Sequence, residues 1–294
     1  FRCRRLPGRL DPAVRRDRRY PPRAEARRAP AARPAPARRR RHVERGSGDD
    51  HAVLGGLQDG NAITNTVYRY NVLADSWSAI SNFPDGSFWI SAAAVVGKKL
   101  YSIGGTYTLA LNECTPRVKI LNLISNTWSD GANMPFGRVF HSVTAYQDSL
   151  IYCAGGWGYP SGTVYNDVYL YNANTNTWRS ATNMPSPRCG GVLAAAGDTL
   201  VYVCGGPNWT NPTATNTVYR GVVSQSDRSV ITWDSTGAVY PGGVRNSIYG
   251  ASWGQKGIIV SGGYQVSTVT SLSLIHISEP TRRTPISYAV FCLK

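Results

Sequence analysis

Short apolar runs alternate with polar turn residues along most of the chain. Around residue 150, the runs Val139 to Ala145 and Leu150 to Ala154 are joined by the turn residues Gln147-Asp148-Ser149. Residues 167–172 then alternate between apolar and polar side chains, and a further short run follows at 177–180 after more turn residues. Period-two alternation with turns between short runs is typical of strands, so this unit predicts four β-strands.

The same unit recurs about every 50 residues. Five glycine pairs follow apolar runs and mark the period, at Gly55-Gly56, Gly104-Gly105, Gly155-Gly156, Gly205-Gly206 and Gly262-Gly263. The first four pairs are each followed by a tryptophan, at Trp77, Trp128, Trp178 and Trp233. Paired glycines suit a backbone with positive φ in a crowded place, and a tryptophan can bury its large ring between neighbouring units.

The repeats predict one all-β region at residues 51–270. Its units span residues 51–86, 87–137, 138–187 and 188–244, with a partial fifth unit at 245–270. A four-stranded sheet cannot bury both faces alone, so we expect the units to stack around an axis.

The period, the Gly-Gly pairs, the spaced aromatics and the Met-Pro-x-x-Arg segments at Met134 and Met184 together resemble the kelch repeat. The resemblance implies an incomplete kelch-type β-propeller of four to five four-stranded blades. Propellers of that family have six or seven blades, so four and a half would leave an exposed sheet edge.

The two ends of the chain differ from the repeats. Residues 1–48 carry 17 Arg, no Lys and four acidic residues, giving 17 − 4 = +13 of the total charge of +15. This Arg/Ala/Pro-rich segment predicts disorder, and it is open whether it is a basic arm or out-of-frame DNA read as protein. Residues 271–294 resemble translated sequencing-adapter DNA and are left out of the fold prediction.

The repeat region itself is electrically neutral, with 12 basic and 12 acidic residues between 49 and 270. We therefore expect no nucleic-acid binding by the folded domain. The sequence has no apolar run long enough for a membrane span, and its six cysteines show no disulfide pattern. The compartment stays open between cytoplasmic and extracytoplasmic, as does glycosylation of the Asn208-Trp-Thr triplet.

The kelch resemblance implies a ligand-binding mouth formed by two sets of loops. The candidates are Arg138, Arg188, Arg245 and Ser87 in the segments that lead into each blade, and Tyr107, Trp157, Tyr159, Trp209 and Tyr264 in the loops after the glycine pairs. Arginine suits capture of carboxylate or phosphate, and aromatics give rigid contact area. The alternative is that these residues only brace the loops.

Catalysis is the weaker of two hypotheses. Some kelch propellers are copper oxidases or sugar isomerases, but residues 51–270 hold only His51 and His141 as imidazole ligands, and Asp130, Asp148, Asp167, Asp198 and Asp234 are expected mostly in turns. We therefore expect no cofactor, metal site or catalytic residue, and a module that binds a protein or peptide. A carbohydrate-binding or carbohydrate-active propeller is the alternative.

Overall fold

The structure is a computed structural model that describes residues 40–45, 50–57, 62–110, 112–207, 214–255, 257–265 and 268–269. All of the described residues lie in one compact unit, Ala37–Lys294. Every regular element among them is a β-strand, which confirms the predicted all-β class.

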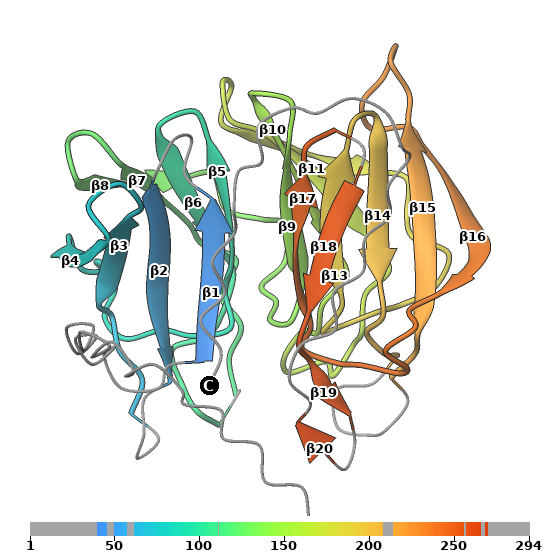
Figure 1. Ribbon diagram of the computed structural model, residues 1–294, viewed down its shortest axis with the longest axis horizontal. Coiled ribbons are helices and arrows are strands. Elements are labelled where there is room, and N and C mark those ends of the chain that lie inside the picture. Colours follow the sequence, from blue (N-terminus) through green and yellow to red (C-terminus); the bar gives the residue numbers. More distant parts are fainter. Residues whose placement is uncertain are drawn as a thin grey trace, which may run out of the picture. The chain divides into compact units, whose positions relative to one another are not determined.

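Four consecutive antiparallel sheets of four strands form the blades (Figure 1). Neighbouring strands in each blade are also neighbours in sequence, so each blade is a simple meander. Blade 1 contains β1 (Arg40–Arg45), β2 (Asp50–Leu57), β3 (Val67–Asn71) and β4 (Ser76–Ile80); blade 2 contains β5 (Ala92–Val96), β6 (Lys99–Ile103), β7 (Val118–Asn122) and β8 (Thr127–Gly131). Blade 3 contains β9 (Ser142–Tyr146), β10 (Leu150–Ala154), β11 (Val168–Asn172) and β12 (Thr177–Ala181); blade 4 contains β13 (Val192–Ala196), β14 (Thr199–Val203), β15 (Thr217–Val223) and β16 (Ile231–Val239).

The remaining strands begin a fifth blade. They are the pair β17 (Tyr249–Trp253) and β18 (Gly257–Ser261), and the short pair β19 (Tyr264–Gln265) and β20 (Thr268–Val269). The first strands of successive blades are neighbours, in the order β1, β5, β9, β13, β17. This side-by-side order of first strands is the blade arrangement of a propeller, as the repeat predicts.

Strand β1 lies within the segment 1–48 that the sequence predicts to be disordered. Its backbone pairs with β2, with Arg45 opposite His51 and Val43 opposite Val53. The pairing joins backbone to backbone, so it does not need the apolar alternation by which the other strands are recognised. The first blade therefore begins before residue 51. The rest of segment 1–48 and all of 271–294 lie outside the described residues.

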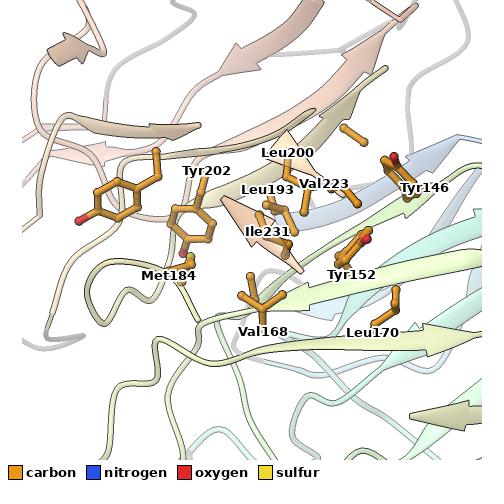
Figure 2. Close-up of a cluster of buried hydrophobic side chains, with 13 residues drawn as sticks. Tyr146, Tyr152, Val168, Leu170, Met184, Leu193, Leu200, Tyr202, Val223 and Ile231 are labelled. Atoms are coloured by element: carbon orange, nitrogen blue, oxygen red, sulfur yellow. The ribbon is translucent and has the colours of Figure 1, made fainter. Parts of the chain in front are cut away.

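The hydrophobic core lies between blades rather than within them. Figure 2 shows the cluster between blades 3 and 4, where Tyr152 and Leu170 of blade 3 meet Leu193 and Tyr202 of blade 4. Burying one such side chain contributes roughly 1.5–3 kcal/mol. The cluster agrees with the prediction that a blade needs its neighbours in order to cover its faces.

The glycine pairs join one blade to the next. Gly104 has φ +65°, and a Cβ there would lie 2.8 Å from the Arg138 carbonyl oxygen of the following blade. The next residue, Gly105, donates its N–H to that same carbonyl at 2.9 Å. Glycine is therefore required both for the positive φ and for the close approach.

In blade 4 the glycine-pair positions fall one residue earlier than the sequence predicts. Cys204, with φ +61°, takes the first position, because its N–H bonds to Thr217 as that of Gly155 bonds to Asp167. Gly205 takes the second position and donates to Arg245. Gly206 instead forms a bridge with Cys189, as Trp157 does with Val139. Strand β14 ends at Val203, two residues before Gly205, whereas β10 ends at Ala154, directly before Gly155. The spacing of the glycine pairs in the sequence does not show this difference.

The repeated tryptophans connect adjacent blades, as predicted. Trp128 donates its indole N–H to the Ser81 carbonyl oxygen at 3.2 Å, Trp178 to that of Ala132 at 2.7 Å, and Trp233 to that of Thr182 at 2.9 Å. Each acceptor lies just after the fourth strand of the preceding blade. The fourth tryptophan, Trp77, belongs to blade 1 and is 40% exposed.

Candidate functional site

The candidate site is the loop face, which we define by two sets of connections at one end of the strands. One set leads into the first strand of a blade, at residues 83–91, 134–141, 184–191 and 240–248. The other joins the second strand to the third, and its described parts include 104–110, 112–117 and 155–167. In an antiparallel meander these connections lie at the same end of the blade, so they share one face.

Arg138 is completely buried at this face, with 0% exposure. Its Nη1 lies 2.5 Å from Asp167 Oδ1 and donates to the Gly155 carbonyl oxygen at 2.9 Å, while Nη2 donates to Asp167 Oδ2 at 3.1 Å. The guanidinium also lies 4.5 Å from the centre of the Tyr165 ring. Burial alone would lower the pKa of Arg138, but the bidentate contact with Asp167 raises it above its ordinary value. Arg138 is therefore held inside blade 3 by Asp167 and Gly155, as the bracing alternative requires.

Arg188 occupies the same position in blade 4 and is also buried, with 8% exposure. Its Nη2 donates to Tyr219 Oη at 2.7 Å and its Nη1 to the Pro187 carbonyl oxygen at 3.0 Å. The hydroxyls of Tyr219 and Ser186 are 2.6 Å apart. Within the described residues, Arg188 forms no ion pair, so both of its side-chain hydrogen bonds are to neutral oxygens.

In blade 2 the arginine position is held by Phe88, not by Ser87 as the spacing predicts. The Phe88 carbonyl oxygen accepts from Gly56 N–H at 3.2 Å, as the Arg138 carbonyl oxygen accepts from Gly105. Trp89 bridges Thr106 as Val139 bridges Trp157. The segment leading into blade 2 has one additional residue, which moves Ser87 out of register. Phe88 is buried and its ring stacks on that of Phe83, with the two ring centres 3.6 Å apart.

A second ion pair in blade 2 has its charges reversed relative to blade 3. Asp85, in the segment leading into the blade, lies 2.8 Å from Arg117 Nη1 and 2.9 Å from Lys119 Nζ. Arg117 stands where blade 3 has Asp167, since its carbonyl oxygen accepts from Gly104 N–H as that of Asp167 accepts from Gly155. Burial raises the pKa of Asp85, but Lys119 and Arg117 outweigh it and hold that pKa below its usual range. Tyr107 donates to the same carboxylate at 3.2 Å.

The remaining aromatic candidates have different surroundings. Trp157 is half-buried and forms backbone bridges with Val139 and Val164, and its ring centre lies 6.3 Å from that of Tyr159. Tyr159 is 44% exposed. Trp209 and the Asn208 triplet lie outside the described residues, and Tyr264 is described only as part of strand β19.

Phe136 is an exposed aromatic residue that the sequence analysis did not single out. It is 54% exposed, and its neighbour Gly137 is so close to the blade 2 loop that a Cβ would lie 2.0 Å from the Cys114 carbonyl oxygen. Cys114 in turn lies 3.8 Å, through its Sγ, from the Trp157 carbonyl oxygen. The chain thus brings Cys114, Trp157 and Tyr159 together beside Gly137, the residue that follows Phe136, and we call Phe136, Cys114, Trp157 and Tyr159 the apolar patch.

Arg245 and His141 are both buried. The Arg245 carbonyl oxygen accepts from Gly205 N–H at 3.0 Å, and its Nη1 lies 3.3 Å from the Val244 carbonyl oxygen. His141 Nε2 lies 3.0 Å from the Ile103 carbonyl oxygen of the preceding blade. In the part of the chain that the structure describes, no three His, Cys, Asp or Glu side chains gather as metal ligands. Nor does that part include a helix long and apolar enough to span a membrane.

The carboxylates were the main signal missed by the sequence analysis. Asp148 and Asp198 do lie in turns, but Asp130 and Asp234 lie in strands β8 and β16. Asp167 precedes β11 and neutralises Arg138 from 29 residues away. Asp167 comes immediately before a predicted strand and not within a tight turn between two strands, and this position is the sequence signal that sets it apart.

Comparisons with known proteins agree with this architecture. The family model described as the KLHDC2/KLHL20/DRC7 Kelch-repeats domain matches residues 42–263. Kelch-like protein terF of Aspergillus terreus is 31% identical over 134 residues, which cover 42% of this chain and 28% of that protein. Human Kelch repeat and BTB domain-containing protein 2 is 33% identical over 122 residues, 39% of this chain and 18% of that protein.

Among solved structures, that of YjhT superposes with a TM-score of 0.64 at 16% sequence identity, covering 76% of this chain and 72% of that one, and it supports the fold alone. The matched region spans less than a third of the length of these curated relatives. Because the family model covers three quarters of the sequence, from the first blade to the start of the fifth, the chain belongs to the kelch-repeat family.

Proposed function

We propose that the chain is a non-catalytic interaction module that binds a protein or peptide through its loop face. The observation that carries this proposal is the apolar patch of Phe136, Cys114, Trp157 and Tyr159. Its two most exposed rings, those of Phe136 and Tyr159, are held by loops that are themselves fixed to the blades. Rigid aromatic side chains with large exposed area are the residues that dominate protein interfaces.

The loops that hold the patch are well anchored by backbone hydrogen bonds. Trp157 exchanges two bonds with Val139, at 2.8 and 2.9 Å, and Gly158 N–H donates to the Thr163 carbonyl oxygen at 2.9 Å. A surface that is already ordered loses little conformational entropy when it binds. This favours recognition of an extended peptide or a partner loop.

The test is a displayed peptide library screened against the full chain, followed by affinity measurements on the selected peptides. We expect the double variant Phe136→Ser/Tyr159→Ser to lose at least tenfold in affinity. Ile124→Ser is the matched control, because Ile124 is 77% exposed on the β7–β8 turn, at the other end of the strands. It should bind as the wild type does.

Two results would contradict the proposal. Selected peptides that bind the double variant as tightly as the wild type would place the binding surface elsewhere. A glycan array that gives saturable binding, where the peptide library gives none, would favour the carbohydrate-binding alternative.

A further inference from the structure

We infer that Ser186, in the segment leading into blade 4, is a phosphorylation site whose phosphate is held within the chain by Arg188 and Tyr219. The inference goes beyond the proposed function, because it concerns a covalent modification of this chain and not the capture of a partner. Three features of the molecule support it: the prolines on either side of Ser186, the hydrogen-bond partner of its hydroxyl, and the charge of Arg188.

The backbone around Ser186 has the form of a kinase substrate. Proline stands on both sides of the serine, in Pro185-Ser186-Pro187, and both prolines are exposed. Proline disfavours the helical region for the residue before it, so Ser186 is biased toward an extended backbone. The segment is tied to blade 3 at its two ends, where the N–H groups of Met184 and Arg188 donate to carbonyl oxygens at 2.8 and 3.0 Å. An extended, exposed stretch with proline directly after the serine is what proline-directed protein kinases bind.

The Ser186 hydroxyl already lies beside groups that can bind a phosphate. Its Oγ is 2.6 Å from Tyr219 Oη, and Arg188 Nη2 donates to that same Oη at 2.7 Å. Ser186 and Arg188 therefore share one hydrogen-bond partner. A phosphate on Oγ would place three acceptor oxygens next to the Tyr219 hydroxyl and the Arg188 guanidinium, and both of these groups can donate to it.

The charge of Arg188 favours an anion at this place. In blade 3 the equivalent Arg138 is paired with Asp167, but the residue of blade 4 that corresponds to Asp167 is Thr217, whose carbonyl oxygen accepts from Cys204 N–H. Arg188 is buried and forms no ion pair with any residue the structure describes. Buried charges are normally paired, and a phosphoserine carries a charge of about −1.5 to −2 at pH 7. Phosphorylation would thus supply the counter-charge from two residues away in the same chain.

Blade 2 offers a matched comparison, because Thr115-Pro116-Arg117 has the same order of hydroxyl residue, proline and arginine. There the arginine already has a carboxylate, since Arg117 pairs with Asp85 at 2.8 Å. The Thr115 hydroxyl accepts from Arg117 N–H at 3.2 Å, and the Thr115 N–H donates to the Gly105 carbonyl oxygen at 2.9 Å. We therefore expect phosphorylation at Ser186 and not at Thr115.

The modification is a phosphoryl transfer from ATP, catalysed by a proline-directed protein kinase. The Ser186 Oγ attacks the γ-phosphorus of ATP, and the bond from that phosphorus to the β–γ bridging oxygen breaks. ADP leaves with the bonding electron pair, and the hydroxyl proton passes to the catalytic aspartate of the kinase. The products are the phosphoserine chain and ADP.

The first test incubates the full chain with ATP and a proline-directed kinase that phosphorylates the isolated peptide 180–192. We expect mass spectrometry to find phosphate on Ser186 of the full chain. Ser186→Ala should remove this incorporation, and Thr115→Ala, the matched control, should retain it. If the kinase modifies the peptide but leaves Ser186 of the folded chain unmodified, the inference is wrong.

The second test introduces phosphoserine at position 186 during translation and follows the phosphate by ³¹P NMR as the pH is varied. A neighbouring guanidinium favours the dianion, so we expect the second pKa of the phosphate to lie about 1 below its value in the same chain unfolded in urea. Arg188→Gln should remove this difference. Thr217→Asp should also reduce it, because the new carboxylate competes for the guanidinium in a chain that keeps Arg188.

A phosphate pKa that is the same in the folded and unfolded chain would overturn the inference. A pKa that is lowered equally in the wild type, Arg188→Gln and Thr217→Asp would do so as well, since Arg188 would then not hold the phosphate. Neither test uses a binding partner. A failed peptide selection on the apolar patch would therefore leave this inference standing, and an unmodified Ser186 would leave the interaction module standing.

Discussion

Arg138 in blade 3 and Arg188 in blade 4 hold the same backbone position, yet the two guanidinium groups have different hydrogen-bond partners. The carbonyl oxygen of each accepts from the second position of the preceding blade's glycine pair, at 2.9 Å from Gly105 and 2.8 Å from Gly156. Arg138 is neutralised within its own blade by Asp167, whereas the side chain of Arg188 donates, within the described part of the chain, to neutral oxygens alone. A repeated residue thus keeps its place in the fold while the residue before the third strand decides whether it has a counter-charge.

Blade 2 has a third arrangement of charges between the segment leading into the blade and the start of its third strand. Its ion pair between Asp85 and Arg117 joins the same two segments as the pair of blade 3, but with the signs exchanged. The link between the segment leading into a blade and the start of its third strand therefore tolerates either polarity. Of blades 2, 3 and 4, as far as their residues are described, blade 4 lacks one half of this link.

Removing the carboxylate of blade 3 is expected to have the largest effect. Asp167→Thr makes blade 3 resemble blade 4 and leaves the fully buried Arg138 without its counter-charge. We expect a loss of about 3 kcal/mol in the free energy of unfolding, measured by urea denaturation. Asp148→Thr, in an exposed turn, is the control and should change stability by less than about 0.5 kcal/mol. A loss no greater than that of the control would show that Arg138 does not need Asp167.

The reversed pair of blade 2 should contribute less and should depend on pH. Asp85→Asn is expected to cost about 1–2 kcal/mol near neutral pH, because it weakens charged hydrogen bonds to Arg117 and Lys119. The folded state lowers the pKa of Asp85, so its stabilisation is present above the unfolded-state pKa of about 3.9 and is lost as the pH falls through the folded-state value. Urea denaturation at several pH values should show wild type and variant converging below about pH 4. A constant difference down to pH 2 would contradict this assignment.

The smallest expected change is a gain. Thr217→Asp gives Arg188 the carboxylate that blade 3 provides for Arg138, and we expect about 1 kcal/mol of added stability after the desolvation of the new carboxylate is offset. Thermal unfolding against Thr217→Asn separates the effect of charge from that of shape. A destabilised Thr217→Asp variant with an unaffected Thr217→Asn variant would show that Arg188 is already neutralised.

The repeat and most of its strands could be predicted from sequence because the glycine pairs and apolar runs are local signals. Register was harder to predict. One additional residue before Trp89 moved Phe88 into the arginine position, and strand β14 moved Cys204 into a glycine position. The number of residues between two motifs shows that one segment is longer than its equivalent in another blade. It does not show at which residue the extra length is accommodated, and therefore which residue takes the equivalent backbone position.

Whether each arginine has a carboxylate partner could not be predicted from the sequence, for a different reason. Asp167 lies 29 residues from Arg138, and only the pairing of the strands brings the two side chains together. Since Arg138 and Arg188 both follow Met-Pro-x-x, their local sequences look alike. The difference between them depends on the residue before the third strand, and its importance becomes visible once the register is known.

The most direct test of the account compares Arg138→Gln with Arg188→Gln in urea denaturation of the full chain. Arg138→Gln should lose about 3 kcal/mol, since it breaks a buried ion pair. Arg188→Gln should change stability by less than about 1 kcal/mol, since it removes a charge that forms no ion pair with any residue the structure describes. Similar large losses in both variants would contradict the claim that Arg138 has a counter-charge which Arg188 lacks.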